Sequence, residues 1–519
     1  MKIKDLVRKL DFDLLTPEGE VITDAETRET MLEREISSIT HNSGKVVDGS
    51  LFFCIAGSRK DGHEFAGDAV EKSAAALVVQ RDPQIAKSIG GPAGSGDEAA
   101  DRRAPVIIRV EDSRLAMAVI SAAWYGDPAQ EMKVIGVTGT KGKTTTTYMV
   151  RSILESAGIR TGLVGTIEVL YQTPEKEVRI PAANTTPESI DLQRIFREMA
   201  DSGVEAVVME VSSQALMLHR TSGFVFDLGI FTNLSPDHIG PNEHKDFEDY
   251  LHCKSLLFSQ CRTGILNGDD KWCDRILEGH TCEVETFGLG EKNDLRAENI
   301  GLVHTPGELG VEFDTKGTVE LHAHVPAPGR FSVYNALCAI AVCRHFGVSA
   351  EDVRGALRRI HVRGRIEMVT VSDDFPLMLD DAHTAMALES LLRTLREYDS
   401  GRLVCVFGCG GDRARSRRFE MGEVSGRLAD FTIITSDNPR SEEPEAIIAD
   451  IVTGLAPTGG SYVMIPDRKD AVRYAIRNGQ PGDIIVLAGK GHEDYQEIKG
   501  KKYPMDERVM IREILAENA

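Results

Sequence analysis

Short apolar runs alternate with mixed polar and apolar stretches along most of this 519-residue chain. Continuous apolar runs bounded by glycine, proline or polar residues are typical of parallel strands buried on both faces, and the mixed stretches between them favour helices. The sequence therefore predicts an α/β fold made of repeated strand and helix units. We expect strands at residues 50–55, 74–79, 134–138, 206–209, 228–232, 264–267, 403–407, 431–435 and 484–488.

The length of the chain predicts several domains, because it exceeds what one hydrophobic core usually supports. We expect a small α/β domain at residues 1–128, a central doubly wound domain at 129–360 and a third, Rossmann-like α/β domain at 361–519. Residues 90–103 are rich in glycine, alanine and charge, and predict a solvated loop insertion in the first of these domains.

The composition is that of an ordinary globular protein, with 41% hydrophobic and 27% charged residues and a formal net charge of −21. So acidic a chain lacks the basic face that nucleic acids require, and no apolar run is long enough to cross a membrane. Charge interrupts the first residues where a signal peptide needs an apolar block, and none of the nine cysteines forms a Cys-x-x-Cys pair. We expect a cytoplasmic protein that binds neither nucleic acid nor membrane. The sequence is silent on oligomeric state, and our working expectation is a monomer.

One segment runs from an apolar strand through a glycine turn directly into an amphipathic helix. Gly139 and Gly142 allow a tight turn whose N–H groups can point at phosphate oxygens, while Lys143 can reach the terminal phosphates and the Thr144 hydroxyl can hold Mg²⁺. Because Val137 occupies the first glycine position of the longer G-x-x-x-x-G-K-[ST] pattern, the loop has the shorter form G-T-x-G-K-T. It predicts triphosphate binding and names no reaction by itself. A plain glycine turn is the competing interpretation, and it gives no reason for the lysine and threonine. The expected helix has an apolar face formed by Met149, Val150, Ile153 and Leu154, and it should end at Gly158.

Polar clusters directly follow five of the expected strands. In open α/β sheets, ligands bind at the carboxyl ends of the strands. Any one of these clusters could be a turn, but five in the same position predict a ligand-binding cleft between domains. They are residues 210–213, 232–238, 408–413, 436–440 and 489–493.

Taken together, these residues resemble the Mur ligase family, whose members join an amino acid to a carboxylate at the expense of ATP. The resemblance implies a uridine-nucleotide domain at 1–128, a central P-loop ATPase domain at 129–360 and an amino-acid-binding domain at 361–519. Further matching positions, in family order, extend it over nearly the whole chain: Ser43, residues 61–63 and 184–187, Lys254, residues 329–331, Asn335 and residues 364–365.

The resemblance also implies roles for residues that would bind ATP and Mg²⁺. Lys143 would stabilise charge on the transferring phosphoryl group, and Glu210 would hold a metal ion. Lys254 resembles the lysine that the family carbamylates, which turns a cation into an anionic oxygen ligand. Unmodified, a lone lysine is more often a surface residue. The implied nucleotide contacts are Gly139, Thr140, Lys141, Gly142, Lys143, Thr144, Thr145, Asn335 and Arg365, and the implied metal ligands are Thr144, Glu210, His238 and Lys254.

Residues 437–440 read Asp-Asn-Pro-Arg, as in the diaminopimelate-adding members of the family, where the arginine clamps the distal carboxylate of the amino acid. The resemblance therefore implies an ATP-dependent ligase of peptidoglycan precursor synthesis that adds meso-2,6-diaminopimelate to UDP-N-acetylmuramoyl-L-alanyl-D-glutamate through an acyl phosphate. The implied amino-acid contacts are Arg413, Asp437, Asn438, Pro439, Arg440, Gly489 and Glu493. The implied acceptor contacts are Ser43, Asn184, Thr185, Thr186, Ser212 and Arg220.

The chain departs from the family pattern at several positions, and the implied ATP-binding residues match that pattern better than the implied nucleotide-sugar contacts do. Two alternatives therefore stay open: a related ligase that uses L-lysine or another amino acid or acceptor, and an ATP-binding relative without turnover. The departures are Gly44, Lys141, Gln214, Leu218, residues 240–244, Asp381, Ala385, Arg417 and Phe419.

Overall fold

A computed structural model describes residues 1–57, 60–83, 104–236, 239–240, 243–305, 308–398 and 401–517. The chain divides into two compact units, the first made of Met1–Thr147 and Gly158–Thr286, the second of Tyr148–Ala157 and Phe287–Ala519. The expected insertion at 90–103 lies outside the described residues. Within the described residues, no helix is long and apolar enough to span a membrane.

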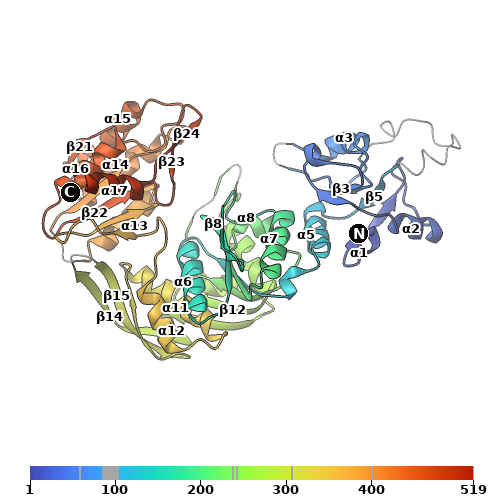
Figure 1. The fold of residues 1–519 in the computed structure, drawn as a ribbon, viewed down its shortest axis with the longest axis horizontal. Coiled ribbons are helices and arrows are strands. Elements are labelled where there is room, and N and C mark those ends of the chain that lie inside the picture. Colours follow the sequence, from blue (N-terminus) through green and yellow to red (C-terminus); the bar gives the residue numbers. More distant parts are fainter. Residues whose placement is uncertain are drawn as a thin grey trace. The chain divides into compact units, whose positions relative to one another are not determined.

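The N-terminal part of the first unit is a five-stranded sheet with the order β1-β5-β4-β3-β2, drawn in blue in Figure 1. Four strands are parallel and β1 is antiparallel to β5. The strands expected at 50–55 and 74–79 are confirmed as β3 and β4. The strands are β1 (Asp13–Leu15), β2 (Ser38–Thr40), β3 (Ser50–Phe53), β4 (Ala76–Val79) and β5 (Val106–Arg109), and the helices are α1 (Ile3–Val7), α2 (Ala25–Leu32), α3 (Ala66–Glu71) and α5 (Ser113–Trp124).

The central sheet of the first unit has the strand order β12-β11-β6-β10-β7-β8-β9. Its first five strands are parallel and buried, as the continuous apolar runs predict, whereas β8 and β9 add an antiparallel ribbon that the sequence did not predict. The strands are β6 (Lys133–Thr138), β7 (Thr161–Val164), β8 (Glu168–Gln172), β9 (Glu177–Pro181), β10 (Ala206–Glu210), β11 (Phe226–Phe231) and β12 (Cys261–Asn267). The helices are α7 (Ser189–Asp201), α8 (Ser213–Met217), α9 (Phe247–Ser255) and α10 (Cys273–Ile276).

The helix after the glycine turn is α6 (Lys143–Ser156), and it matches the expectation. The four residues of its apolar face, Met149, Val150, Ile153 and Leu154, have no exposed surface. The chain turns after it at Gly158, whose φ of +80° favours glycine.

The second unit begins with an antiparallel ribbon that the sequence did not predict. Here β14 (Leu295–Thr305) pairs with β15 (Glu308–Gly317), which pairs with β16 (His322–Val325). The end of β13 (Glu283–Gly288) pairs with β14 through Phe287 and Gly288. Helices α11 (Arg330–Arg344) and α12 (Ala350–Arg358) follow.

The C-terminal sheet has the order β17-β18-β22-β19-β20-β21, with every strand parallel except β17. The apolar side chains of α13, α14 and α15 pack on one face and those of α16 and α17 on the other. Because β22, β19 and β20 are neighbours, the polar clusters that follow them share one edge of the sheet. The strands are β17 (Glu367–Val369), β18 (Leu377–Asp380), β19 (Leu403–Phe407), β20 (Phe431–Ile434), β21 (Ser461–Met464), β22 (Ile484–Ala488), β23 (Tyr495–Ile498) and β24 (Lys501–Pro504). The helices are α13 (Ala385–Leu395), α14 (Ser416–Leu428), α15 (Pro444–Leu455), α16 (Arg468–Arg477) and α17 (Glu507–Ala516).

Three sheets with mostly parallel strands confirm the α/β class. The domain boundaries at 128 and 360 stay a prediction.

Candidate active site

The loop between β6 and α6 is a turn whose backbone requires glycine. Gly139 and Gly142 have φ angles of +145° and +86°. A Cβ atom at Gly139 would lie 1.9 Å from Thr232 Oγ1, so a side chain there would displace the loop. Asn233 Oδ1 accepts a hydrogen bond from the Lys141 N–H at 3.0 Å, and Asn233 Nδ2 donates one to the Lys141 carbonyl oxygen at 2.9 Å. The loop is therefore held in shape by contacts to its main chain.

Lys143 folds back over this loop. Its Nζ donates to the carbonyl oxygens of Gly139 and Thr140, at 3.0 and 3.1 Å. A cation held over a ring of main-chain groups at the start of a helix is an arrangement that attracts phosphate. The residues expected around the phosphates, 139–145, thus form one continuous loop and first helical turn.

The end of β10 places a buried carboxylate beside the first turn of α6. Thr144 Oγ1 donates to Glu210 Oε1 at 3.0 Å, and both side chains are nearly inaccessible to solvent. Thr166 also donates to this carboxylate, through its N–H to Oε1 at 2.8 Å and its hydroxyl to Oε2 at 3.0 Å. Hard oxygen donors in such proximity suit Mg²⁺, so the residues present fit the expected ion. No sequence motif had singled out Thr166.

Lys254 lies at the same loop and is not a surface lysine. Only 2% of it is exposed, its Nζ donates to the Gly139 carbonyl oxygen at 2.9 Å, and it lies 4.7 Å from the centre of the Tyr250 ring. The structure thus brings Lys143, Thr144, Glu210 and Lys254 to one loop. The other expected metal ligand, His238, lies outside the described residues.

His244, the last residue of the 240–244 departure from the family pattern, joins helices α8 and α9. Its Nε2 is 2.8 Å from Ser213 Oγ in α8, and its Nδ1 is 3.0 Å from Asp249 Oδ2 in α9. Because α8 begins three residues after Glu210 and α9 carries Lys254, this buried imidazole ties together the elements that position both.

Four of the six expected acceptor contacts gather near Glu210. The Thr186 hydroxyl donates to the Glu210 carbonyl oxygen at 2.9 Å and accepts from the Ser212 N–H at 3.1 Å. Arg220 donates to the Thr186 carbonyl oxygen at 3.0 Å and pairs with Glu188 at 2.8 Å. Thr185 Oγ1 is 3.1 Å from the hydroxyl of Thr166. The remaining two are Asn184, exposed just before this group, and Ser43, which begins a short 3-10 helix beside the N-terminal sheet.

At the edge of the C-terminal sheet, the loops after β19 and β20 pack backbone to backbone. A Cβ atom at Gly411 would lie 1.9 Å from the Pro439 carbonyl oxygen, so the loops can approach this closely only with glycine there. Arg440 has a φ of +52°, which is unusual for a side-chain-bearing residue. Its guanidinium donates to the Gly411 carbonyl oxygen at 2.6 Å and lies 3.3 Å from Glu497 Oε2. The strained backbone and these two contacts fix the direction of the Arg440 side chain.

The other predicted amino-acid contacts surround Arg440 on the same loops. Arg413 is exposed, and none of the described residues forms a hydrogen bond or ion pair with it. Asp437 is buried, and its Oδ2 has no partner within the described part of the chain. Gly489 adjoins that carboxylate, because a Cβ atom at Gly489 would lie 3.2 Å from Asp437 Oδ2. A buried, unpaired carboxylate oxygen is costly without a ligand, so Asp437 is available to a cationic group.

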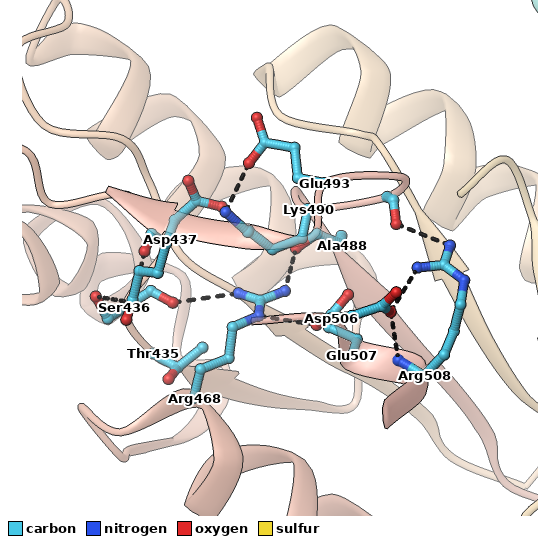
Figure 2. Close-up of polar contacts among 12 residues, drawn as sticks. Thr435, Ser436, Asp437, Arg468, Ala488, Lys490, Glu493, Asp506, Glu507 and Arg508 are labelled. Atoms are coloured by element: carbon cyan, nitrogen blue, oxygen red, sulfur yellow. Dashed lines mark hydrogen bonds and ion pairs between the residues drawn. The ribbon is translucent and has the colours of Figure 1, made fainter. Parts of the chain in front are cut away.

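Three charged residues that the motifs did not assign hold these loops together (Figure 2). Arg468, in α16, is 1% exposed and pairs with equally buried Glu507 at 2.8 Å. Its guanidinium also donates to the carbonyl oxygens of Ser436 and Ala488, at 3.3 and 3.0 Å. It therefore clamps the last residues before the 437–440 and 489–493 segments. Lys490 is buried among side chains of both segments.

The two expected nucleotide contacts of the second unit lie in different elements. Arg365 pairs with Asp381 at 2.8 Å, so the aspartate that replaces the family's tyrosine has an ionic partner here. Neighbouring Asp380 is buried, and this burial raises its pKa to about 6 despite the charge of Arg365 and N–H donors from Ile366 and Ala382. Asn335 is buried within α11.

Comparison with known proteins places the chain in a family. It matches the model of the Mur ligase middle domain over residues 137–343, that of the Mur ligase glutamate ligase domain over 364–491, and that of the Mur ligase family catalytic domain over 35–125. The chain belongs to the Mur ligase family.

The chain is similar over its full length to curated diaminopimelate ligases. It is 40% identical to "UDP-N-acetylmuramoyl-L-alanyl-D-glutamate--2,6-diaminopimelate ligase 1" of Clostridium acetobutylicum, with 100% of both chains covered. It is 41% identical to the ligase of the same name, without the final number, from Caldanaerobacter subterraneus, with 93% of this chain and 95% of that protein covered. A solved structure titled as the same ligase has a TM-score of 0.67 and 25% identity, covering 100% of this chain and 99% of the other. A structure of the ligase MurF of Thermotoga maritima with ADP shares the fold, with a TM-score of 0.56 and 16% identity over 94% of this chain and 99% of that one.

Proposed function

We propose that this protein is an ATP-dependent ligase that joins meso-2,6-diaminopimelate to UDP-N-acetylmuramoyl-L-alanyl-D-glutamate. A carboxylate is a poor electrophile, so the acceptor carboxylate first attacks the γ-phosphorus of ATP and releases ADP. The amine of diaminopimelate then attacks the resulting acyl phosphate, loses a proton and expels inorganic phosphate. One amide bond forms for each ATP consumed.

The first step belongs to the loop between β6 and α6. Lys143 and the loop N–H groups offset charge on the phosphoryl group as it transfers. The Thr144 hydroxyl and Glu210 carboxylate supply oxygen ligands for Mg²⁺, which when bound would neutralise phosphate charge. We propose that Lys254, buried beside the loop, acts as its carbamate, formed when the neutral amine adds to CO₂ and loses a proton. His238 completes the proposed ligand set.

The second step belongs to the loops of the C-terminal sheet. The distal end of diaminopimelate carries one carboxylate and one ammonium group. Arg440 offers a planar guanidinium that matches a carboxylate, and Arg413 adds a second cation. Asp437 and Glu493 offer anionic oxygens for the ammonium group. The proposed acceptor contacts are Ser43, Asn184, Thr185, Thr186, Ser212 and Arg220.

Two opposite charges on the same loops support diaminopimelate as the amino acid. One is the guanidinium of Arg440, which is held by Gly411 and Glu497, and the other is the unpaired buried oxygen of Asp437. L-Lysine would satisfy the anionic side alone, because it has no distal carboxylate to offer the guanidinium. A site built for both groups should therefore prefer diaminopimelate.

The direct test is to identify the product. Purified protein is incubated with Mg²⁺, ATP and the UDP-sugar dipeptide, together with either meso-diaminopimelate or L-lysine. The products are then identified by their masses in mass spectrometry. We expect the diaminopimelate adduct as the main product. Equal or greater yield of the lysine adduct would reject the proposed amino acid, and the absence of any adduct would reject the ligase activity.

A further inference from the structure

Lys490 is an unassigned cation enclosed at the proposed amino-acid site. Its side chain has no exposed surface, and its ammonium group has three acceptors. These are Glu493 Oε2 at 2.6 Å, Asn438 Oδ1 at 2.9 Å and the Tyr495 carbonyl oxygen at 2.7 Å. Because an ammonium group has three donors, each is used once. Figure 2 shows this group reaching the Glu493 carboxylate.

These bonds fix the orientation of the Asn438 amide. Its Oδ1 accepts from Lys490 and also from the Glu497 N–H at 2.9 Å. The amide nitrogen must therefore point the other way, where it donates to Glu493 Oε2 at 2.9 Å. Lys490 thus acts on Glu493 both directly and through the amide of Asn438.

Glu493 is consequently held by one of its two oxygens. Both bonds that reach its carboxylate, from Lys490 and Asn438, end on Oε2, and none of the described residues donates to Oε1. The side chain is 27% exposed, so the carboxylate is open to solvent on one side. A charged oxygen that is presented in a fixed direction suits a cationic group of a ligand.

Resting on the function proposed above, we propose that Lys490 is a positioning residue for amino-acid specificity, which holds Glu493 so that Oε1 meets the distal ammonium group of a diamino acid. Enclosed as it is, Lys490 touches no ligand itself. Its effect reaches the substrate through Glu493.

The charge of Glu493 supports this role. Burial by itself would raise the pKa of Glu493, but the ammonium of Lys490, its hydrogen bond, the Asn438 amide and nearby His492 together hold that pKa below its usual range. Without Lys490 both of its contributions would be lost and the pKa of Glu493 would rise. Glu493 would then accept a proton at a higher pH and lose its attraction for an ammonium group.

The test replaces Lys490 with methionine, which keeps the length of the side chain and removes its charge. We expect kcat/KM for diaminopimelate to fall roughly tenfold or more, while KM for ATP and for the UDP-sugar acceptor stays unchanged. The acid limb of the pH profile for diaminopimelate should move to higher pH. Lys469→Met, which removes a partly exposed lysine paired with Glu513 in the same sheet domain, is the matched control and should change none of these values.

A second amino acid substrate distinguishes loss of the positioning role of Lys490 from a general loss of structure in the variant. 2-Aminopimelate keeps the distal carboxylate and lacks the distal ammonium group, so its kcat/KM should be the same in wild type and Lys490→Met. An equal loss with both amino acids would overturn the proposal.

The variant Glu493→Gln provides a double-mutant cycle, and it removes the charge that Lys490→Met leaves unpaired. Once Glu493 is neutral, loss of Lys490 should cost little further diaminopimelate activity. Additive losses would contradict the proposal. Failure of the proposed function would be distinguishable, because wild type itself would then form no diaminopimelate adduct.

Discussion

The proposed phosphate loop (residues 139–142) and the proposed amino-acid loops (residues 408–413, 436–440 and 489–493) both lie at carboxyl ends of parallel strands, but different contacts hold them in shape. In the phosphate loop, Lys143 and Lys254 both rest on main-chain carbonyl oxygens, and glycine gives the turn its shape. In the amino-acid loops, buried ionic side chains join one segment to another: Arg468 does so from α16, and Lys490 of the 489–493 segment bonds to Asn438. A short sequence motif can therefore predict a site that is shaped by main-chain contacts. A site held by long-range ion pairs depends on residues far apart in the sequence.

The largest effect is expected at the phosphate loop. Lys143→Ala should lower kcat roughly 10²- to 10³-fold, because a preorganised cation opposite the transferring phosphoryl group is lost. KM for diaminopimelate should be unchanged, since the amino-acid loops are held independently. Steady-state ADP release measures both values, with Lys176→Ala, at an exposed lysine, as control. If the KM for diaminopimelate also rose, the proposed amino-acid loops would depend on the phosphate loop, and the prediction would be wrong.

The next largest effect is on stability. Arg468→Met leaves Glu507 charged and buried without its partner, which should cost about 3 to 5 kcal/mol of unfolding free energy. Urea unfolding followed by a probe in the C-terminal domain measures this loss. Replacing Glu507 with leucine as well should recover part of it, because no unpaired charge then remains. An unfolding midpoint equal to that of wild type would mean that the pair does not hold these loops together.

A smaller effect is expected for the arginine that would bind the distal carboxylate. Arg440→Ala should raise KM for diaminopimelate roughly 100-fold, since two charge-assisted hydrogen bonds are lost, and should leave ATP binding unchanged. Initial rates at varied diaminopimelate concentration measure the KM, and calorimetry with an ATP analogue measures nucleotide binding. Arg393→Ala, which removes an exposed arginine of α13, is the control. Unchanged diaminopimelate kinetics would remove Arg440 from the site.

The smallest effect is a pH dependence of stability. Glu367 is 4% exposed and pairs with Arg508. Burial alone would raise the pKa of Glu367, but hydrogen bonds from His361, Arg508 and the Gly364 N–H lower it from 4.5 to about 2. Because the folded pKa is the lower one, the stabilisation is complete above about pH 4.5 and is lost as the pH falls toward 2.

Its size should be about 2 kcal/mol after an allowance for solvent screening. The measurement is the unfolding free energy of wild type and Glu367→Gln between pH 7 and pH 2.5. The two curves should converge at the acid end. Parallel curves would contradict the shifted pKa.

The sequence predicted the architecture well where one local pattern decides the structure. The continuous apolar runs became β10, β19 and β22, and the G-T-x-G-K-T loop became a glycine turn that leads into α6. The antiparallel strands β14 to β16 were missed because their charged and apolar residues alternate, as in the burial of β15, and give no continuous run.

Parts of the candidate site could not be read from the sequence. Residues brought together by the fold include Thr166, which is 44 positions from Glu210, and Arg468, which is 39 positions from Glu507. No rule of sequence spacing connects such partners, so the sequence alone does not indicate that this threonine and this arginine belong to the site. The functional roles of the predicted site residues stay predictions, and His238 lies outside the described residues.

We propose that two separately built sites serve one ligation reaction. The most direct test is steady-state ADP release with Mg²⁺, ATP and the UDP-sugar dipeptide, measured with meso-diaminopimelate, with L-lysine and without an amino acid. We expect sustained ADP release with diaminopimelate, much slower release with lysine, and none beyond a first turnover without an amino acid. Sustained release that does not depend on the amino acid would contradict this proposal.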